Sequence, residues 1–348
     1  MITFNIEPPL ADFDAAIQSK IDLKTKPVGA LGVLETIAFK IAKIQQTLNP
    51  ISKKPTIVVF AGDHGIAEEG LVNPYPQEVT FQMVLNFIAK GAAINVFAIQ
   101  NNLVLKIVDA GVNYNFGKIE GLIDAKIAMG TSNYLLSSAM TIDQCKQSLT
   151  KGTEIIENIH KEGSNIVGFG EMGIGNTAAA ALLMSCICKI PIEDCVGKGT
   201  GANKEQLNLK VKTLKQVVEK HAEVNTSNSL EILSTFGGFE IAQMCGGMLK
   251  AAELGMLILV DGFISSAAML VAQNINKNVL EYAIFTHHSN EQGHTKMLAY
   301  MNAKPLVNLG MRLGEGSGIA VAYPIIQSAS TFFNKMASFD SAQITNKD

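Results

Sequence analysis

Residues 165–177 read NIVGFGEMGIGNT, a short apolar run that leads through a glycine-rich turn into a polar helix start. Other apolar runs are followed in the same way by glycine or acidic residues and then by helical spacing, at 56–60, 105–108, 256–260 and, less clearly, 283–285. This repeated order of strand, turn and helix is typical of a doubly wound, mostly parallel sheet. We therefore expect an α/β, Rossmann-like fold. Because ligands bind beyond the carboxyl ends of the strands in such sheets, the glycine and acidic residues there are expected to line the functional site.

The two ends of the chain show helical spacing and no strand alternation. Apolar residues recur at helical intervals in residues 37–48 and 319–336. We expect residues 1–55 and 303–348 to form a smaller helical domain, with the loop around Glu315 in the second segment. Residues 56–302 are then expected to form the large α/β domain.

The composition argues for a compact enzyme without a nucleic-acid partner. Hydrophobic residues make up 47% of the 348 residues and charged residues 17%, as in globular enzymes. Nucleic-acid binding would need a basic face with stacking aromatic residues. The net charge is −3, aromatic residues make up only 6%, and tryptophan is absent.

Neither a membrane span nor secretion is expected. The longest apolar stretch, residues 254–272, is interrupted by Asp261 and Gly262, which favours a buried strand followed by a packed helix. The first residues lack the charged and apolar regions of a signal peptide. Five cysteines, an odd number, favour reduced thiols. We therefore expect the protein to act in the cytoplasm.

Glu315 is the first candidate for a catalytic base. It lies among glycines in residues 308–318, which read NLGMRLGEGSG. Glycine lets backbone approach a ligand closely, so an acid framed by glycines is presented to something small. The alternative from this segment alone is a glycine-rich turn whose glutamate faces water.

Two glycine turns are candidate phosphate sites. Residues 168–177 run into Ala178–Ala181, so their glycines would open a helix whose free N–H groups and dipole suit a single phosphate. Residues 197–201, GKGTG, precede a helical segment at 205–218 that carries Lys210. Together the two turns suggest a site for a ribose 5-phosphate group. Ordinary turns between strands and helices are the alternative.

Residues 168–173 also match the dinucleotide-binding pattern, with glycines at the first, third and sixth positions. The match is weak because Glu171 would lie where the backbone should approach an anionic pyrophosphate.

The histidines do not have the spacing of metal ligands. His287 and His288 are adjacent and lie six to seven residues before His294, whereas zinc ligands on a helix are three to five residues apart. We expect these histidines and His64 to form hydrogen bonds or to shape the pocket.

Taken together, several motifs resemble those of the nicotinate-nucleotide–dimethylbenzimidazole phosphoribosyltransferase family, also called the CobT family. They occur in the family's order over nearly the whole chain and are highly specific as a set: residues 26–35 (KPVGALGVLE), 61–66 (AGDHGI), 75–80 (YPQEVT), 170–177 (GEMGIGNT), 199–201 (GTG), 260–263 (VDGF), 287–294 (HHSNEQGH) and 313–318 (LGEGSG). Two departures are modest: Ala30 stands where Ser is common, and the loop 71–74 (LVNP) differs from the commoner version. Because that loop would border the base pocket, the identity of the accepted base stays open.

The resemblance implies transfer of phosphoribose from nicotinate mononucleotide to 5,6-dimethylbenzimidazole. The products would be nicotinate and α-ribazole 5′-phosphate, which supplies the lower ligand of cobalamin. The resemblance also implies a homodimer that needs no metal or organic cofactor.

The glycine turns, the framed carboxylate and the resemblance together lead us to expect roles for individual residues. Glu315 would accept the imidazole proton, Glu171 would lie near the ribose, and Lys210 would support the phosphate or that carboxylate. The phosphate and ribose would contact Gly173, Gly175, Asn176, Thr177, Gly199, Thr200, Gly201 and Asp261. The base would contact Tyr75, Gln82, Met83, Leu313 and Gly314.

Two other functions stay open at this point. An NAD(P)-dependent oxidoreductase of the Rossmann type would use residues 168–173 to bind its cofactor. A non-catalytic nucleotide-binding protein would hold the mononucleotide without turnover.

Overall fold

A six-stranded sheet, parallel throughout, organises the protein, and the computed structural model describes residues 3–199 and 201–346. The strand order is β3-β2-β1-β4-β5-β6, so the chain winds outward from the centre in both directions. The strands are β1 (Thr56–Gly62), β2 (Val104–Gly111), β3 (Leu122–Asp124), β4 (Ile166–Met172), β5 (Leu257–Val260) and β6 (Ala283–Phe285). The expected Rossmann-like fold is confirmed. The sequence did not reveal β3, because three residues are too few to show a period.

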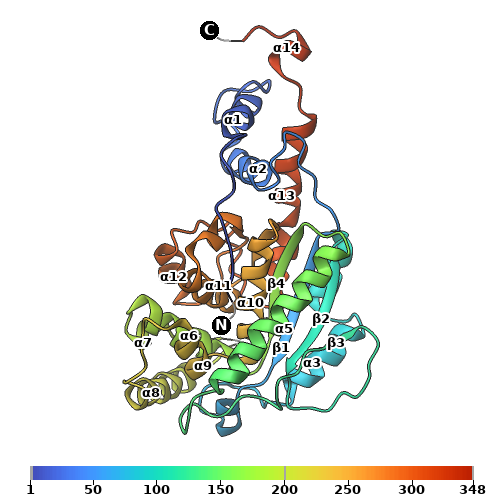
Figure 1. The fold of residues 1–348 in the computed structure, drawn as a ribbon. Coiled ribbons are helices and arrows are strands. Elements are labelled where there is room, and N and C mark those ends of the chain that lie inside the picture. The colour runs from blue at the N-terminus through green and yellow to red at the C-terminus, as the bar shows by residue number, and fades with distance from the viewer. Residues whose placement is uncertain (1–2, 200, 347–348) are drawn as a thin grey trace.

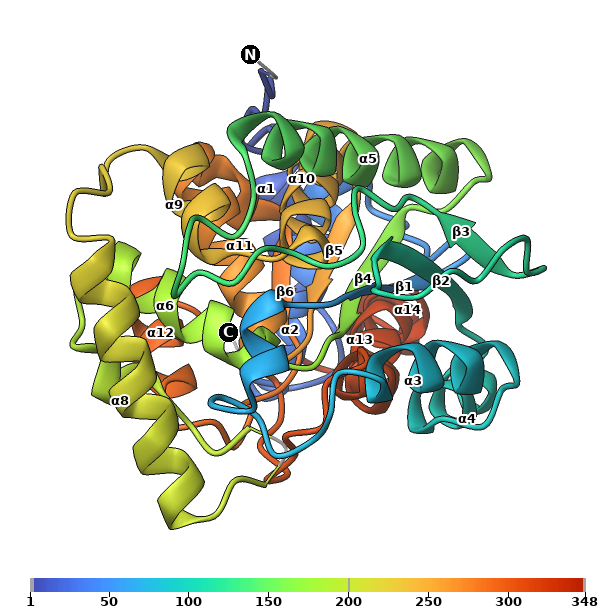
Figure 2. The same cartoon turned by 90° about the horizontal axis from the view of Figure 1, so that it is seen from below.

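Helices cover both faces of the sheet (Figures 1 and 2). Figure 2 shows α5 (Ile142–Lys161) and α10 (Phe239–Glu253) on one face, and α3 (Val79–Ile88), α4 (Ala93–Gln100) and α13 (Ser317–Lys335) on the other. A Cβ at Gly152 of α5 would overlap the carbonyl oxygen of Gln243 on α10, so glycine allows these two helices to touch through their backbones.

Most of the remaining helices of the body lie on the side of the sheet where β5 and β6 are found (Figure 2). The remaining helices are α6 (Asn176–Cys188), α7 (Ile192–Cys195), α8 (Lys204–Lys220), α9 (Ser229–Phe236), α11 (Phe263–Ile275) and α12 (His294–Tyr300), with the short 3-10 helices η1 (Gly65–Glu69) and η2 (Lys277–Tyr282).

Helices from the N-terminal and C-terminal segments of the chain meet in an arm that rises from the body (Figure 1). The arm contains α1 (Asp14–Asp22), α2 (Val33–Ile44), the far end of α13, and α14 (Phe339–Ala342). Helix α2 both begins and ends four residues before the range 37–48 predicted from the sequence. Its N-cap, Gly32, and the residue beyond its C-cap, Gln46, have φ of +54° and +46°, which a continuing helix does not adopt.

The apolar stretch at residues 254–272 is resolved as predicted into strand β5, the turn at Asp261 and Gly262, and helix α11. One other stretch, Val79–Gln100, is long and apolar enough by composition to cross a membrane, and a third of it is buried. The structure divides that stretch into α3 and α4, which are separated at Lys90, whose φ is +64°.

Candidate active site

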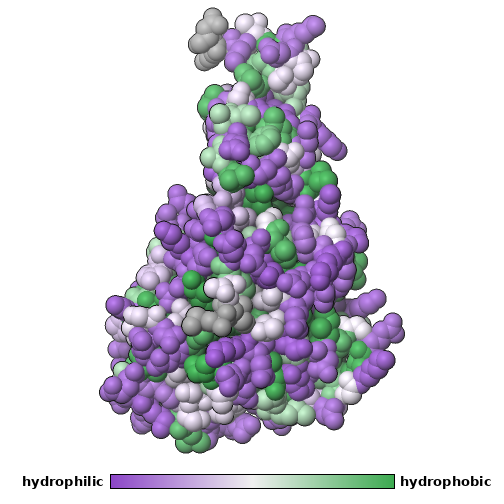
Figure 3. All heavy atoms as spheres, in the orientation of Figure 1, coloured by the Kyte–Doolittle hydropathy of each residue, from purple (hydrophilic) through white to green (hydrophobic). Residues whose placement is uncertain are grey.

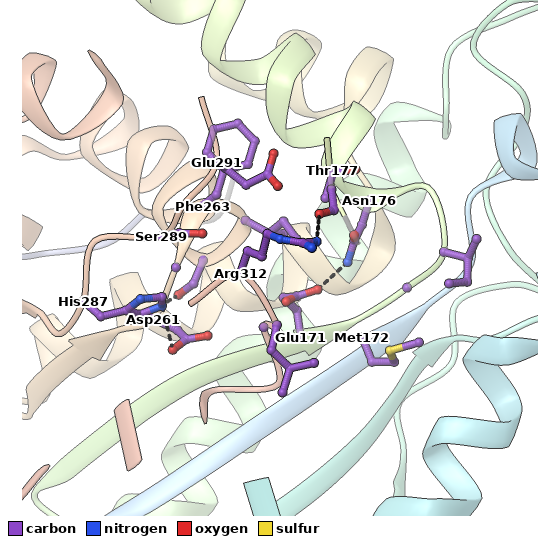
Figure 4. A pocket seen from close by; sticks show the side chains of 18 residues that line it. Glu171, Met172, Asn176, Thr177, Asp261, Phe263, His287, Ser289, Glu291 and Arg312 are labelled. Atoms are coloured by element: carbon purple, nitrogen blue, oxygen red, sulfur yellow. Dashed lines mark hydrogen bonds and ion pairs between the residues drawn. The ribbon is translucent and has the colours of Figure 1, made fainter. Parts of the chain in front are cut away.

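A cavity opens at the carboxyl ends of β4, β5 and β6 (Figure 4). Glu171 and Met172 close β4, Asp261 follows β5, and His287 follows β6. The cavity lies where the parallel sheet predicts a ligand site, and the C-terminal loop covers it with Leu313 and Gly314.

The turn between β4 and α6 presents the start of a helix to the cavity. Gly175, the N-cap of α6, has φ of +97°, which only glycine adopts readily. A Cβ at Gly173 would overlap the carbonyl oxygen of Gly62, so this position also requires glycine. Gly173, Asn176 and Thr177 line the cavity. The N-terminus of α6, with its backbone N–H groups, therefore suits an anion.

A buried cation lies behind this helix start. Lys210 of α8 is 2% exposed, and its Nζ donates a hydrogen bond to Thr177 Oγ1 at 2.8 Å. Burial lowers the pKa of Lys210 to about 8, and the nearby Glu291 carboxylate opposes that shift. Thr177 thereby links the lysine to the first turn of α6.

Arg312 brings a second cation to the cavity. It is the only arginine in a chain with 28 basic residues. Its Nη1 donates a hydrogen bond to the carbonyl oxygen of Gly199 at 2.8 Å, and both residues line the cavity. Arg312 lies at the exposed rim, and in Figure 4 it projects toward Thr177 and Asn176. A planar guanidinium suits bidentate contact with phosphate.

Glu171 is a buried carboxyl group beside the helix start. It accepts a hydrogen bond from Asn176 Nδ2 and is 6% exposed. Burial, together with the neighbouring Asp261 carboxylate, raises the pKa of Glu171 to about 8. The group is therefore mostly protonated at neutral pH and would ionise next to a cation.

Asp261 lines the cavity but uses both oxygens to hold the C-terminal loop. Oδ2 accepts a hydrogen bond from the Gly316 N–H, and Oδ1 accepts one from the Ile319 N–H, each at 3.2 Å. His287 Nε2 lies 3.5 Å from Oδ1. Burial raises the pKa of Asp261, and the His287 ring opposes that shift. Asp261 thus anchors the N-terminus of α13 immediately after Glu315.

Glu315 belongs to the same loop and directly precedes Gly316. Its φ is +64°, between glycines at +87° and +80°. The side chain is buried, so the alternative of a glutamate that faces water is wrong. Its Oε2 accepts a hydrogen bond from the Ile94 N–H at 3.3 Å, and burial raises the pKa of the carboxyl group. The Glu315 carboxylate is next to the cavity but is not among the groups that line it.

Comparison with known proteins identifies the family. A family model described as phosphoribosyltransferase matches residues 6–344. A nicotinate-nucleotide–dimethylbenzimidazole phosphoribosyltransferase from Dechloromonas aromatica is 51% identical over the whole of both chains. The chain belongs to this phosphoribosyltransferase family. The relative of the same name from Shewanella oneidensis is 50% identical, over 99% of this chain and 97% of the relative. The crystal structure of CobT from Thermus thermophilus superposes with a TM-score of 0.91 at 35% identity, covering 97% of this chain and 100% of the other.

The resemblance seen in the sequence is thereby confirmed, and the dinucleotide alternative loses its structural basis. Gly168 and Gly170 lie inside β4 rather than in a turn. A Cβ at Gly168 would lie 2.9 Å from the Ile319 side chain, and one at Gly170 would lie 2.6 Å from the Glu315 backbone. These glycines make room for the backbone at Glu315 and for Ile319 in the first turn of α13, not for a pyrophosphate.

The structure gathers only part of the predicted phosphoribosyltransferase site. The predicted residues that line the cavity are Glu171, Gly173, Asn176, Thr177, Gly199, Asp261, Leu313 and Gly314. The others that the structure describes do not line it: Tyr75, Gln82, Met83, Gly175, Lys210, Gly201 and Glu315. Thr200 lies outside the described residues. Lys210 still reaches the site through Thr177, whereas Gln82 is exposed and Tyr75 is 47% exposed.

Sequence reasoning missed several residues of the cavity. Arg312 and Glu291 were not proposed, although each lies within or beside a recognised motif. The signal for Arg312 was its uniqueness in a lysine-rich chain. Glu291 is buried, and neither carboxylate oxygen has a hydrogen-bond partner among the described residues.

The histidines lie in polar contacts. His64 Nε2 pairs with Glu240 Oε1 at 2.7 Å in the core, and His294 Nδ1 accepts a hydrogen bond from the Ser289 N–H at 2.8 Å. Within residues 3–199 and 201–346, no group of three His, Cys, Asp or Glu side chains is arranged to hold a metal ion.

Proposed function

We propose that this enzyme transfers phosphoribose from nicotinate mononucleotide to 5,6-dimethylbenzimidazole, giving α-ribazole 5′-phosphate and nicotinate for the lower ligand of cobalamin. One observation carries the proposal: the N-terminus of α6, Arg312 and the buried carboxyl group of Glu171 line one cavity, and Lys210 bonds to Thr177 behind it. The names of the relatives supply the substrates.

The 5′-phosphate would bind at the start of α6. Backbone N–H groups and the Thr177 hydroxyl would donate to its oxygens, while Lys210 and Arg312 would supply two positive charges. Gly199 and Gly201 would lie beside the same phosphate, because both are close to Arg312. Gly199 accepts a hydrogen bond from its guanidinium, and a Cβ at Gly201 would come 3.9 Å from that group.

Glu171 would lie beside the ribose and the pyridinium ring. A positive charge there favours the ionised carboxylate, so binding would release the proton that burial retains. The carboxylate would then stabilise positive charge that develops at C1′.

Glu315 would act as the base. One imidazole nitrogen attacks C1′, the bond from C1′ to the pyridinium nitrogen breaks, and its electron pair stays on nicotinate. The proton on the other imidazole nitrogen passes to Glu315, with inversion at C1′. Because the pyridinium nitrogen becomes neutral as it leaves, the step needs neither an acid nor a metal or organic cofactor. The azole would lie between α3 and Leu313, next to Glu315.

The enzyme would act as a homodimer in the cytoplasm. The arm exposes several large apolar side chains: Leu10 (61%), Leu23 (44%), Val28 (75%) and Val33 (61%). Apolar side chains are visible over the arm in Figure 3. An apolar surface that stands clear of its own body suits a second copy of the chain. Sedimentation at micromolar concentration measures the assembly, and a monomer would contradict it.

The decisive experiment is to incubate the enzyme with nicotinate mononucleotide and dimethylbenzimidazole and to detect both products by mass. Equal amounts of riboside phosphate and nicotinate are expected, with and without a chelator. Mononucleotide binding without any product would favour the non-catalytic alternative. A change in NADH fluorescence on binding would favour the oxidoreductase.

A further inference from the structure

Thr80 joins two parts of the site that are far apart in the sequence. It is fully buried at the start of α3, the helix that carries Gln82 and Met83. Its Oγ1 accepts a hydrogen bond from the Ile174 N–H at 3.0 Å. Ile174 lies in the turn that opens α6 and lines the cavity. One hydroxyl group therefore ties the base-side helix to the phosphate turn.

The carboxylate of Asp63 orients the Thr80 hydroxyl group. The Thr80 oxygen accepts a hydrogen bond from Ile174, so the hydroxyl proton remains free to be donated. The neighbouring Asp63 carboxylate is stabilised by a hydrogen bond from this hydroxyl. Burial raises the pKa of Asp63 to about 6, and the Thr80 hydroxyl is the largest opposing influence. The Oδ1 atom has no partner within normal hydrogen-bond geometry among the described residues, so it is available to that proton.

Asp63 is itself held firmly at the end of β1. Its Oδ2 accepts a hydrogen bond from the Asn113 N–H at 2.8 Å. Its backbone N–H donates to Gly111 and its carbonyl oxygen accepts from Thr131, each at 3.0 Å. Asp63 therefore does not follow if α3 moves, so a movement of α3 separates the Thr80 hydroxyl from Asp63 as well as from Ile174.

We propose that Thr80 is a positioning residue that couples occupancy of the phosphate turn to binding of the base beside α3. The inference rests on the proposed function, including its placement of the base. Any movement of α3 away from the turn breaks the contact with Ile174 and leaves a buried N–H without a partner, which is unfavourable. A phosphate that orders the turn therefore also orders α3, and coupling between two ligands is reciprocal.

The test uses ribose 5-phosphate, which carries phosphate and ribose but no nicotinate to displace. Calorimetry measures the dissociation constant of dimethylbenzimidazole with and without this probe. In the wild type, ribose 5-phosphate is expected to tighten base binding by roughly tenfold, within the usual range of such coupling. In Thr80→Val, which keeps the shape and removes the hydroxyl, the ratio of the dissociation constants without and with ribose 5-phosphate should approach one. Thr80→Ser, which retains a hydroxyl group, should show the same ratio as the wild type.

Thr80→Ala is a second variant without the hydroxyl, and thermal melting shows which variants fold. Wild-type coupling in either folded hydroxyl-free variant would overturn the proposal, as would a ratio of one in the wild type. Unfolding of both hydroxyl-free variants beside a folded Thr80→Ser would also overturn it, in favour of a purely structural role. Failure of the wild type to form riboside phosphate would instead reject the proposed function.

Discussion

Glu315 and Ile94 lie 221 residues apart in the sequence and meet through a hydrogen bond of 3.3 Å. The donor is a backbone N–H in the first turn of α4, and the acceptor is the Oε2 atom of the proposed catalytic base. The positive end of a helix favours a carboxylate, which works against the effect of burial on the pKa of Glu315. One oxygen of the Glu315 carboxylate is thus held in place, and the other is available to accept the proton of dimethylbenzimidazole.

Replacing Glu315 with Gln should lower turnover by roughly 10² or more, a typical contribution of a general base. The amide oxygen of Gln still accepts from Ile94, so folding and mononucleotide affinity should change little. Steady-state kinetics and calorimetry measure the two effects. The matched control is Glu120→Gln, an exposed position that should retain full activity. Near wild-type turnover in the Glu315 variant at neutral pH would reject its role as base.

Arg312→Lys keeps the positive charge but removes the planar fork that reaches Gly199 and the phosphate. We expect the KM for nicotinate mononucleotide to rise by roughly tenfold, equivalent to about 1.4 kcal/mol, with a smaller change in kcat. The exchange Lys204→Arg, at an exposed position, controls for the chemistry of the substitution. An unchanged KM would show that Arg312 acts as a simple charge or not at all.

The pH dependence of kcat/KM for the mononucleotide should have its maximum near pH 8. Ionisation of Glu171, with a pKa of about 8, favours the positively charged pyridinium ring of the substrate, so activity should rise as pH increases toward that value. Lys210 loses its proton with a pKa of about 8, so activity should fall above it. In Glu171→Gln the rising limb should disappear while the falling limb remains. A rising limb that persists unchanged in this variant would assign it to another group.

Gly175→Ala should weaken mononucleotide binding more than base binding. The residue has φ of +97°, and an added Cβ would lie 3.2 Å from Ala67 and 3.3 Å from His64. Both strain and crowding would displace the turn that opens α6. Gly163→Ala is a matched control, since its φ is +98° and an added Cβ would meet nothing within 4 Å. Equal mononucleotide affinity in the two variants would argue against the phosphate turn.

The glycines of β4 show where local pattern misleads. The sequence places a strand end at Val167, because glycines usually mark a turn, yet β4 continues to Met172. The two glycines inside the strand make room for Ile319 and for the backbone at Glu315. Only a contact between distant segments explains why glycine stands there.

Some site residues could be predicted from the sequence, and others were recognised only in the structure. Glu171, Asn176 and Asp261 could be predicted because Glu171 lies at the end of a recognisable strand, Asn176 in the glycine turn after it, and Asp261 directly after another strand. Arg312 comes from a loop without regular structure, and no period indicates where its side chain points. Asp261 was expected to bind the substrate, and the structure shows its oxygens bonded to the loop after Glu315.

By itself the sequence determined the alternation of strands and helices and the edge of the sheet where the site lies, because apolar periodicity and glycine turns are local properties. Only the tertiary structure decided which side chains meet there. The contacts of Lys210 with Thr177, Ile174 with Thr80 and Glu315 with Ile94 span 33, 94 and 221 residues. Periodicity reports which face of an element is buried, whereas a hydrogen bond also depends on how two distant elements are placed, and that placement arises when the whole core packs.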